Sequence, residues 1–248
     1  MDRLFGTESL VVYRRVFDPC GLTTNGELWD CGAKMFALKC LWLARKFDIV
    51  HVHFLDELVP FLKFFYPRKP VVLHYHGSGI RGKWGLRRKY WSKADVVLYS
   101  TLDLLDDETP GCAVYLPNPV DIEIFYPKGV KPKPKAAFHF SYNADDLAME
   151  YAEKYGLELT IYNSKKQGFI PHLRFPEVLC QYRYYIDVKR NASGELLTVP
   201  LSKTALEALA CGLKVITWKG EIAESLPEEH RPEKVLRQLF HLYLRLKE

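Results

Sequence analysis

The sequence predicts an α/β protein built from two domains, each with a parallel sheet. Runs rich in Val, Ile, Phe and Tyr alternate with helical patterns along most of the chain, which is typical of β-α-β units. The stretch KGVKPKPK, residues 128–135, interrupts this alternation with two prolines and four lysines. Such a segment has little to place in a core and is typical of a linker. With 248 residues, the chain is long enough for two small cores.

We therefore predict an N-terminal domain over residues 1–127, a linker over 128–135 and a C-terminal domain over 136–248. Two such domains suggest a cleft between them. In open parallel sheets, ligands bind beyond the carboxyl ends of the strands, so polar residues at strand ends are the first candidates for a site.

The elements of the N-terminal domain follow from short β-rich runs and from apolar residues at helical spacing. The predicted strands are 9–15, 47–54, 70–77, 95–100 and 112–118. The predicted helices are 31–47, 56–66, 84–94 and 101–108, the second of them interrupted or begun near Pro60. A helix between successive strands returns the chain to the same edge of the sheet, so these strands should run parallel.

The same pattern restarts after the linker. The predicted strands are 136–141, 157–163, 184–190 and 213–218. The predicted helices are 144–156, 175–183, 202–212 and about 232–247. Gly156 and Gly212 are the last residues of two of these helices, where glycine commonly ends a helix.

The composition is that of a folded protein, with 48% hydrophobic and 26% charged residues. The net charge of +5 favours anionic ligands or surfaces without singling out nucleic acid. No apolar run reaches the roughly 18 residues that span a bilayer, and the first residues lack a signal-peptide pattern, so we expect a cytoplasmic protein. The six cysteines form no C-x-x-C pair, which predicts buried reduced thiols rather than disulfides or a zinc site.

Residues 202–216, SKTALEALACGLKVI, place one carboxylate inside a small and apolar helix. Ser202 is a good N-cap, and the following amides of Lys203 and Thr204, with the lysine charge, form a site suited to a phosphate. Glu207 lies one turn further on, where it could accept hydrogen bonds from a ribose diol. The alternative is a surface pair between Lys203 and Glu207, which stabilises a helix by only about 0.2–0.5 kcal/mol.

Several stretches in order resemble the GT-B glycosyltransferases, especially the large retaining group called family 4. The donor-binding segment of that family has the form E-(x7)-E-A-x-A-C-G-x-P-V-I, and Glu207–Ile216 matches its second half. Other stretches resemble the family's D-V-V-H-x-H strand, its V-x-T-x-H-G strand end and the A-D-x-V-I…I-P-N-G-V-D-x-x-x-F-x-P segment that closes its first domain. They are residues 48–53, residues 72–77, and residues 94–100 with 116–127.

The resemblance implies two Rossmann-like domains and transfer of a sugar from a nucleotide diphosphate sugar to an acceptor, with retention and without a required metal or other cofactor. It implies that Glu207 binds the ribose. It also implies that His76, followed by Gly77, lies beside the transferred sugar. His51 and His53 stay unassigned, because a histidine in a buried strand is more often a core residue.

The sequence departs from the family pattern at three places. Val199 stands where the first glutamate of the pair is expected, and Glu195 is the nearest upstream acid. The Arg and Lys usual after the first strand of the second domain are missing from residues 141–146, which leaves Lys189, Arg190 and Lys203 as candidates for the diphosphate. The family's first strand and glycine-rich loop have no counterpart here. Either the true start lies upstream or the protein manages without them.

Residues 80–93, IRGKWGLRRKYWSK, carry six basic residues and no acid. On a helix they would form a basic aromatic face suited to an anionic membrane or a lipid-linked or glycan acceptor, which would make the protein peripheral on the membrane. A solvated basic face is the alternative, and a nucleic acid ranks below both. The residues assigned to this surface are Arg81, Lys83, Trp84, Arg87, Arg88 and Trp91.

Two other functions remain open. Val199 and the absent first strand favour a relative that binds a sugar nucleotide or a partner protein without catalysis. A sugar-nucleotide epimerase of the same fold is the second alternative. The sequence identifies neither the base, the sugar and the acceptor nor the oligomeric state.

Overall fold

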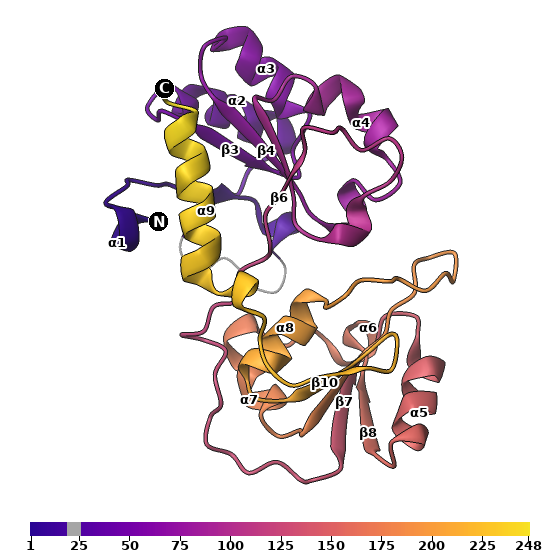
Figure 1. Ribbon diagram of the computed structural model, residues 1–248. Helices are drawn as coiled ribbons and strands as arrows, with labels where there is room; N and C mark the ends of the chain where they lie inside the picture. Colours follow the sequence, from indigo (N-terminus) through magenta and orange to yellow (C-terminus); the bar gives the residue numbers. More distant parts are fainter. Residues whose placement is uncertain (19–25) are drawn as a thin grey trace. The chain divides into compact units, whose positions relative to one another are not determined.

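The computed structural model describes residues 1–18 and 26–248, and within them the chain is an α/β protein with parallel sheets (Figure 1). It divides into two compact units. Of the described residues, the first unit contains 1–18 and 26–118 together with Val235–Glu248, and the second contains Pro119–Lys234. This division differs from the predicted domains 1–127 and 136–248 at both ends.

Two packing features explain the difference. The amide of Val120 donates to the carbonyl of His230 at 3.0 Å, and Phe125 is buried in the core of the second unit, so the chain joins that unit well before residue 128. At the other end, the last helix places Val235 and Leu242 in a core with strands of the first unit. The predicted linker, residues 128–135, therefore lies inside the second unit.

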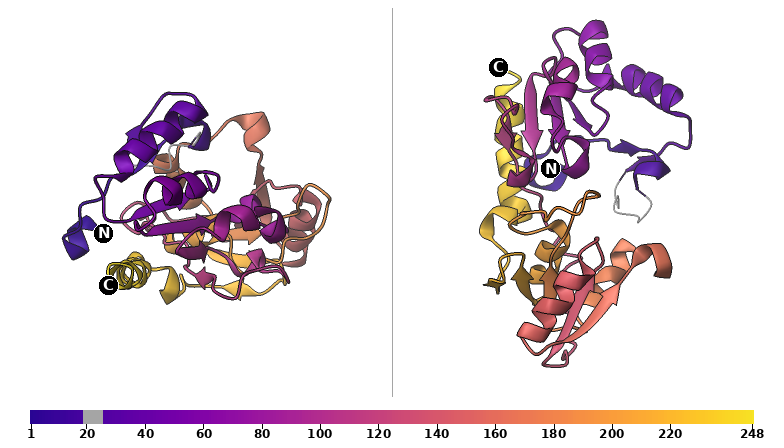
Figure 2. Two further views of the ribbon diagram at one scale, coloured as in Figure 1. Left: turned by 90° about the horizontal axis from the view of Figure 1, so that it is seen from above. Right: turned by 90° about the vertical axis from the view of Figure 1, so that its right-hand side faces the viewer.

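The sheet of the first unit has the order β3-β4-β5-β6 and is parallel throughout. Its strands are β3 (Val50–His53), β4 (Val71–Tyr75), β5 (Val96–Tyr99) and β6 (Val114–Tyr115). One face packs against α2 (Ala33–Ala44), α3 (Leu58–Phe65) and α4 (Trp84–Trp91). The other face is covered by α9 (Pro232–Arg245), whose apolar side packs on Val72 and Leu98 (Figure 2, right).

The N-terminal segment contributes α1 (Asp2–Phe5) and two short strands outside the main sheet. Residues 9–15, predicted as a strand, contain β1 (Val12–Tyr13), which pairs in parallel with β2 (Glu27–Leu28). The predicted helix 101–108 is reduced to a 3₁₀ turn at Leu102–Leu104. Its continuation fails because the Thr109 hydroxyl accepts a hydrogen bond from the amide of Asp106 at 2.8 Å, which closes a turn instead.

The sheet of the second unit has the order β11-β10-β9-β7-β8. All neighbours are parallel except β11, which is antiparallel to β10. Its strands are β7 (Ala136–Phe140), β8 (Glu158–Tyr162), β9 (Tyr184–Asp187), β10 (Lys214–Thr217) and β11 (Ile222–Ala223). Its helices are α5 (Asp145–Lys154), α6 (Ser164–Gln167), α7 (Phe175–Leu179) and α8 (Lys203–Ala210).

The strand order of the second unit reverses between β7 and β9. From β7 the chain passes through α5 to β8 on one side, and it then returns across β7 to reach β9 on the other. Helix α5 packs on one face of the sheet with Ile186 and Ile216, whereas α7 and α8 pack on the opposite face with Phe138 and Tyr185 (Figure 1). The carboxyl ends of β7 and β9 therefore form a topological switch point, the usual ligand position in such sheets.

Among the described residues, no helix combines the length and the apolar character that a membrane span requires. The described cysteines are free thiols, of which Cys180 and Cys211 are buried as predicted. Cys31 and Cys40 are half-buried and Cys112 is exposed, so the prediction of buried thiols holds only in part. Cys20 lies outside the described residues.

Candidate functional site

The switch point of the second unit brings together the end of β9 and the start of α8. Asp187, the last residue of β9, accepts hydrogen bonds from the Ser202 amide at 2.8 Å and from the Ser202 hydroxyl at 2.6 Å. The hydroxyl in turn accepts from the amide of Ala205 at 3.3 Å. Ser202 is thus the N-cap of α8, as predicted.

Asp187 already places a carboxylate at the N-terminus of α8, where the sequence predicted a site for a phosphate. It is a buried carboxylate that sequence reasoning did not select, and it occupies the positive end of α8. Asp187 takes both the amide and the hydroxyl of Ser202, so a diphosphate would have to compete with this carboxylate for them. Contact between Ser202 and a diphosphate stays a prediction. The amides of Lys203 and Thr204 lie in the first turn, where a helix offers them no acceptor.

Glu207 faces inward on α8 and is only 5% exposed. Burial raises its pKa to about 7, although the charges of Lys203 and Lys189 act in the opposite direction. The Lys203 ammonium lies 3.9 Å from the Glu207 carboxylate. The pair between these residues therefore exists, but it joins an exposed lysine to a buried acid and is not the exposed surface pair of the alternative interpretation.

Two further buried groups lie at the same switch point, and sequence reasoning selected neither. Tyr185 on β9 is fully buried, and its hydroxyl has no hydrogen-bond partner among the described residues. His139 on β7 is also buried, with Nδ1 at 2.9 Å from the carbonyl oxygen of Ile186 and Nε2 at 3.5 Å from Asp145. Buried polar groups without full satisfaction are costly, which marks this region as a candidate binding site.

The two predicted diphosphate ligands after β9 differ in their surroundings. The Arg190 guanidinium pairs with Asp146 at 2.5 Å, so binding an anion would require it to leave or share this carboxylate. Lys189 places its ammonium 5.8 Å from the centre of the Tyr142 ring, and its charge acts on both Glu207 and His139. Lys189 is therefore the better-placed cation of the two.

Position 199, where the family pattern expects a carboxylate, is a half-buried valine. The nearest acid, Glu195, is turned into its own loop, where its carboxylate accepts from the Asn191 side chain at 2.7 Å. The same loop is closed by the Asn191 carboxamide oxygen, which accepts from the Glu195 amide at 2.9 Å. Glu195 therefore does not stand in for the missing first glutamate.

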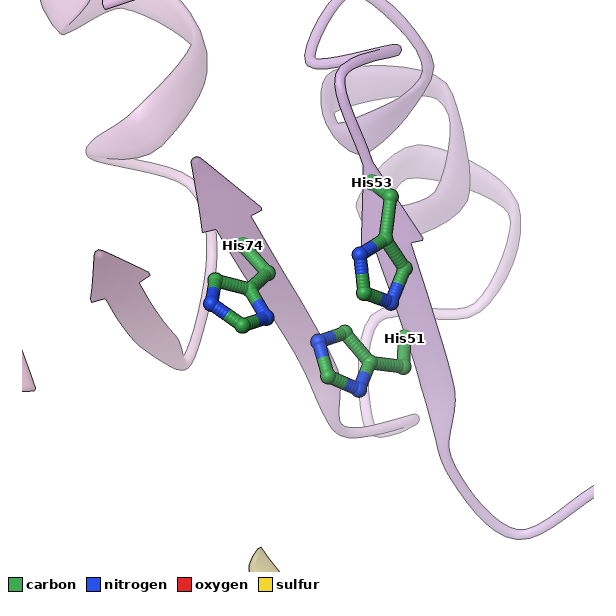
Figure 3. A group of neighbouring side chains, drawn as sticks. All are labelled: His51, His53 and His74. Carbon is green, nitrogen blue, oxygen red and sulfur yellow. The ribbon is translucent and has the colours of Figure 1, made fainter. Parts of the chain in front are cut away.

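In the first unit, His76 and Gly77 follow the end of β4, as predicted. The His76 Nε2 atom lies 2.9 Å from Nδ1 of His53, the last residue of β3. Gly77 has a φ of 54°, in the left-handed region that favours glycine, and it turns the chain away from the strand. Sequence reasoning left His51 and His53 unassigned and did not single out His74, yet all three lie together (Figure 3). The His76 ring lies beside them, with its centre 4.0 Å from that of His74.

The predicted basic aromatic surface is corrected in part. Trp84 is fully buried, and its indole donates to the carbonyl of Leu104 at 2.6 Å, so it belongs to the core. Trp91 is half-buried and donates to the Trp84 carbonyl at 2.7 Å. Helical periodicity explains both positions, since one side of α4 must pack on the sheet.

The cations of this segment also divide into two groups. Arg87 donates to Asp56 at 3.0 Å and to Glu57 at 2.8 Å, and Arg81 pairs with Asp103. Lys83 and Arg88 are exposed, as predicted. The exposed apolar side chains of this region come from other positions, namely Phe61, Phe64 and Phe65 on α3 and Leu86 on α4.

Comparison of the sequence with models of known protein families gives no match. Comparison with curated proteins gives no significant match either. The resemblance to family 4 glycosyltransferases therefore stays a prediction.

Proposed function

We propose that this protein is a glycosyltransferase of the GT-B type, in which the second unit binds a nucleotide diphosphate sugar. The observation that carries the proposal is Glu207, a buried carboxylate at the switch point with a pKa of about 7. Among the described residues the Glu207 carboxylate has the Lys203 ammonium at 3.9 Å and accepts no hydrogen bond, and such a buried carboxylate is costly unless a ligand supplies donors. The adjacent hydroxyls of a ribose are donors of the right number and spacing.

The cations beside Glu207 suit the rest of such a ligand. Lys203 lies within 3.9 Å of the carboxylate, Lys189 follows β9, and the amides of Lys203 and Thr204 begin α8. These groups would stabilise the charge on a departing diphosphate, and such electrostatic stabilisation is usually the largest single contribution to catalysis. The resemblance to family 4 glycosyltransferases implies that His76, after the end of β4, contacts the transferred sugar. It also implies that the first unit binds the acceptor.

Glu207→Ala is expected to weaken nucleotide binding by roughly 10- to 100-fold, because it removes charge-assisted hydrogen bonds that contribute about 1.5–3 kcal/mol each. The measurement is a thermal-shift series with UDP, GDP, ADP and their sugar conjugates, each variant compared with its own ligand-free form. A ligand at 100 times its Kd adds roughly 2.7 kcal/mol, or on the order of 5–10 °C here. Glu150→Ala, at an exposed glutamate on α5, is the matched control. Equal shifts in all three proteins would rule out the ribose role of Glu207.

A second candidate, binding of a sugar nucleotide without transfer, is favoured by Val199 and by the position of Glu195. No carboxylate from residues 195–199 is placed to contact the donor sugar, since Glu195 is held by Asn191. Product analysis separates the candidates. A free nucleotide diphosphate with a glycosylated acceptor shows transfer, an isomeric sugar nucleotide shows epimerisation, and an unchanged ligand that still stabilises the protein shows binding alone.

We further propose that the first unit contacts an anionic membrane surface through α3 and α4. Phe64 is 78% exposed and Leu86 is 76% exposed, while Arg88 and Lys89 on α4 supply exposed positive charge. Apolar side chains that enter the headgroup region beside lysine and arginine are typical of peripheral membrane attachment. Both helices pack on the same core, so these side chains come from neighbouring elements.

Phe64→Ser combined with Leu86→Ser is expected to reduce cosedimentation with phosphatidylglycerol vesicles by about tenfold, since two large apolar contacts with the bilayer are removed. Phe169→Ser, at another exposed aromatic side chain that lies in the second unit, should bind as the wild type does. Binding should also weaken as salt rises and should be much lower on phosphatidylcholine. Unchanged binding of the double variant would contradict this surface.

A further inference from the structure

Two H-x-H sequences lie on neighbouring strands of the first unit. Residues 51 and 53 are on β3, and residues 74 and 76 are at the end of β4. Alternate residues of a strand share one face of the sheet, so each pair points the same way. The parallel register sets His53 directly beside His74. Four imidazoles therefore gather on the face that α9 covers.

The ring geometry confirms a close cluster. Ring centres lie 4.3 Å apart for His51 and His53, 5.2 Å for His53 and His74, and 5.4 Å for His51 and His74. One nitrogen from each of these three residues lies within 4.8 Å of one from each of the others. Figure 3 shows the three rings turned toward one another from β3 and β4.

Several ring nitrogens of this cluster lack hydrogen-bond partners among the described residues. Among the described residues, Nε2 of His51 and both ring nitrogens of His74 are buried without a hydrogen-bond partner. A neutral imidazole carries one N–H group, so His74 must bury an unsatisfied donor as well as an unsatisfied acceptor. Each such group costs roughly 1–3 kcal/mol, and two on one residue call for a ligand that would satisfy them.

The remaining nitrogens hold two of the rings in orientation. The Tyr243 hydroxyl on α9 lies 2.5 Å from Nδ1 of His51, which directs Nε2 of that ring into the cluster. Nε2 of His76 lies 2.9 Å from Nδ1 of His53. Nε2 of His53 is therefore the nitrogen of that ring that can bind a ligand. A hydrogen bond on one imidazole nitrogen that fixes the other for coordination is the usual outer-shell arrangement of metal-binding histidines.

We propose that His51, His53 and His74 bind a divalent transition-metal ion, with Zn²⁺ as the reference ion. The ligating atoms are Nε2 of His51, Nε2 of His53 and one nitrogen of His74. Ligand distances of about 2.0–2.1 Å require small ring rotations from the present positions, toward a common centre. Three imidazoles leave a fourth coordination position open, and imidazole ligands suit Zn²⁺, Ni²⁺ and Cu²⁺ rather than Mg²⁺ or Ca²⁺.

Two properties of the cluster favour this ligand. The buried Nε2 of His51 and both buried ring nitrogens of His74 have no hydrogen-bond partner among the described residues, so they are open to coordination. His53 is the exposed member of the three and provides a path for the ion. The site lies wholly in the first unit, so it does not depend on the nucleotide site proposed for the second.

The test is titration of the metal-free full-length protein with Zn²⁺ by calorimetry and with Co²⁺ by visible absorption, without nucleotide. We expect one ion per chain and the intense spectrum of four-coordinate cobalt. His53→Ala and His74→Ala should each weaken binding by at least about 100-fold, whereas Tyr243→Phe, which removes only the partner of His51, should weaken it by about tenfold. His241→Ala, at an exposed histidine also on α9, should bind as the wild type does.

Three results would overturn the proposal. They are no binding by the folded wild type, the pale spectrum of six-coordinate cobalt, or equal affinities in the wild type and His53→Ala. His53 is exposed, so its alanine variant should fold, and circular dichroism checks this before titration. If His74→Ala fails to fold, His53→Ala and Tyr243→Phe still decide the question. Failure of nucleotide binding would leave this result unaffected.

Discussion

An Arg87→Ala variant is expected to lose about 3–5 kcal/mol of unfolding free energy at pH 7.5, the usual cost of removing one partner from a buried ion pair. Asp56 is 1% exposed and accepts hydrogen bonds from the Tyr75 hydroxyl at 2.8 Å and from the Arg87 guanidinium at 3.0 Å. Without the guanidinium, the carboxylate stays buried with one neutral donor. Chemical denaturation monitored by circular dichroism measures the loss.

The deficit should depend on pH, because burial already raises the pKa of Asp56 and the Arg87 charge opposes that rise. In the variant the pKa rises further. A carboxyl group with a raised folded-state pKa lowers the unfolding free energy of the protein as pH rises from its unfolded-state pKa toward its folded-state pKa. The stability difference between variant and wild type should therefore be complete at pH 7.5 and smaller near pH 4.5. Arg88→Ala, the neighbouring exposed cation, should change stability by less than about 0.5 kcal/mol.

Similar losses of unfolding free energy in Arg87→Ala and Arg88→Ala would contradict this account. So would a stability loss in Arg87→Ala that does not change with pH. The expected result would assign Arg87 to the packing of α4 against the Asp56 loop rather than to acceptor or membrane binding. Lys83 and Arg88 then remain the exposed cations of the predicted set.

The sequence predicted the elements of the main sheets where the local pattern carries enough information. Residues 136–140 and 184–187 are strands because apolar and aromatic residues fill positions buried on both faces, and the helix at Lys203–Ala210 begins at a serine that caps it. The boundary between the compact units differs from the predicted one. The lysine- and proline-rich stretch marks a loop, whereas the boundary depends on Phe125 and Val235, whose partners are remote in sequence.

In the candidate sites, too, features set by local sequence were predicted and features set by remote contacts were not. Glu207 and the Ser202 cap were predicted because both lie within one helix. Asp187 was missed because its function depends on contact with Ser202, fifteen residues away. The histidine cluster could have been found, since both H-x-H sequences end predicted strands, but only the register that sets His53 beside His74 turns the two pairs into one group. Trp84 was wrongly placed on the surface, because spacing on α4 does not by itself show which face meets the sheet.

A Glu207→Gln variant is expected to be more stable than the wild type at pH 8 by about 3.5 kcal/mol. The pKa of Glu207 is raised by burial from 4.5 to about 7, and each pKa unit corresponds to about 1.4 kcal/mol. Since the unfolded chain releases this proton first, wild-type stability should fall between about pH 4.5 and pH 7 and stay level above. Glutamine keeps the shape without the ionisation, so the difference between the two proteins should be near zero at pH 4.5 and complete at pH 8.

Denaturation at these two pH values measures the difference, with Glu150→Gln as the exposed control that should show none. Lower stability of Glu207→Gln at pH 8 would mean that attraction of the carboxylate to Lys203 and Lys189 exceeds the cost of burying it. The expected gain has a functional counterpart, because ligand hydroxyls donate to the ionised carboxylate. Wild-type affinity for the nucleotide should then rise from pH 6 to pH 8 relative to Glu207→Gln. A carboxylate that destabilises the empty protein and strengthens binding over the same pH range is explained by a ligand site and not by packing.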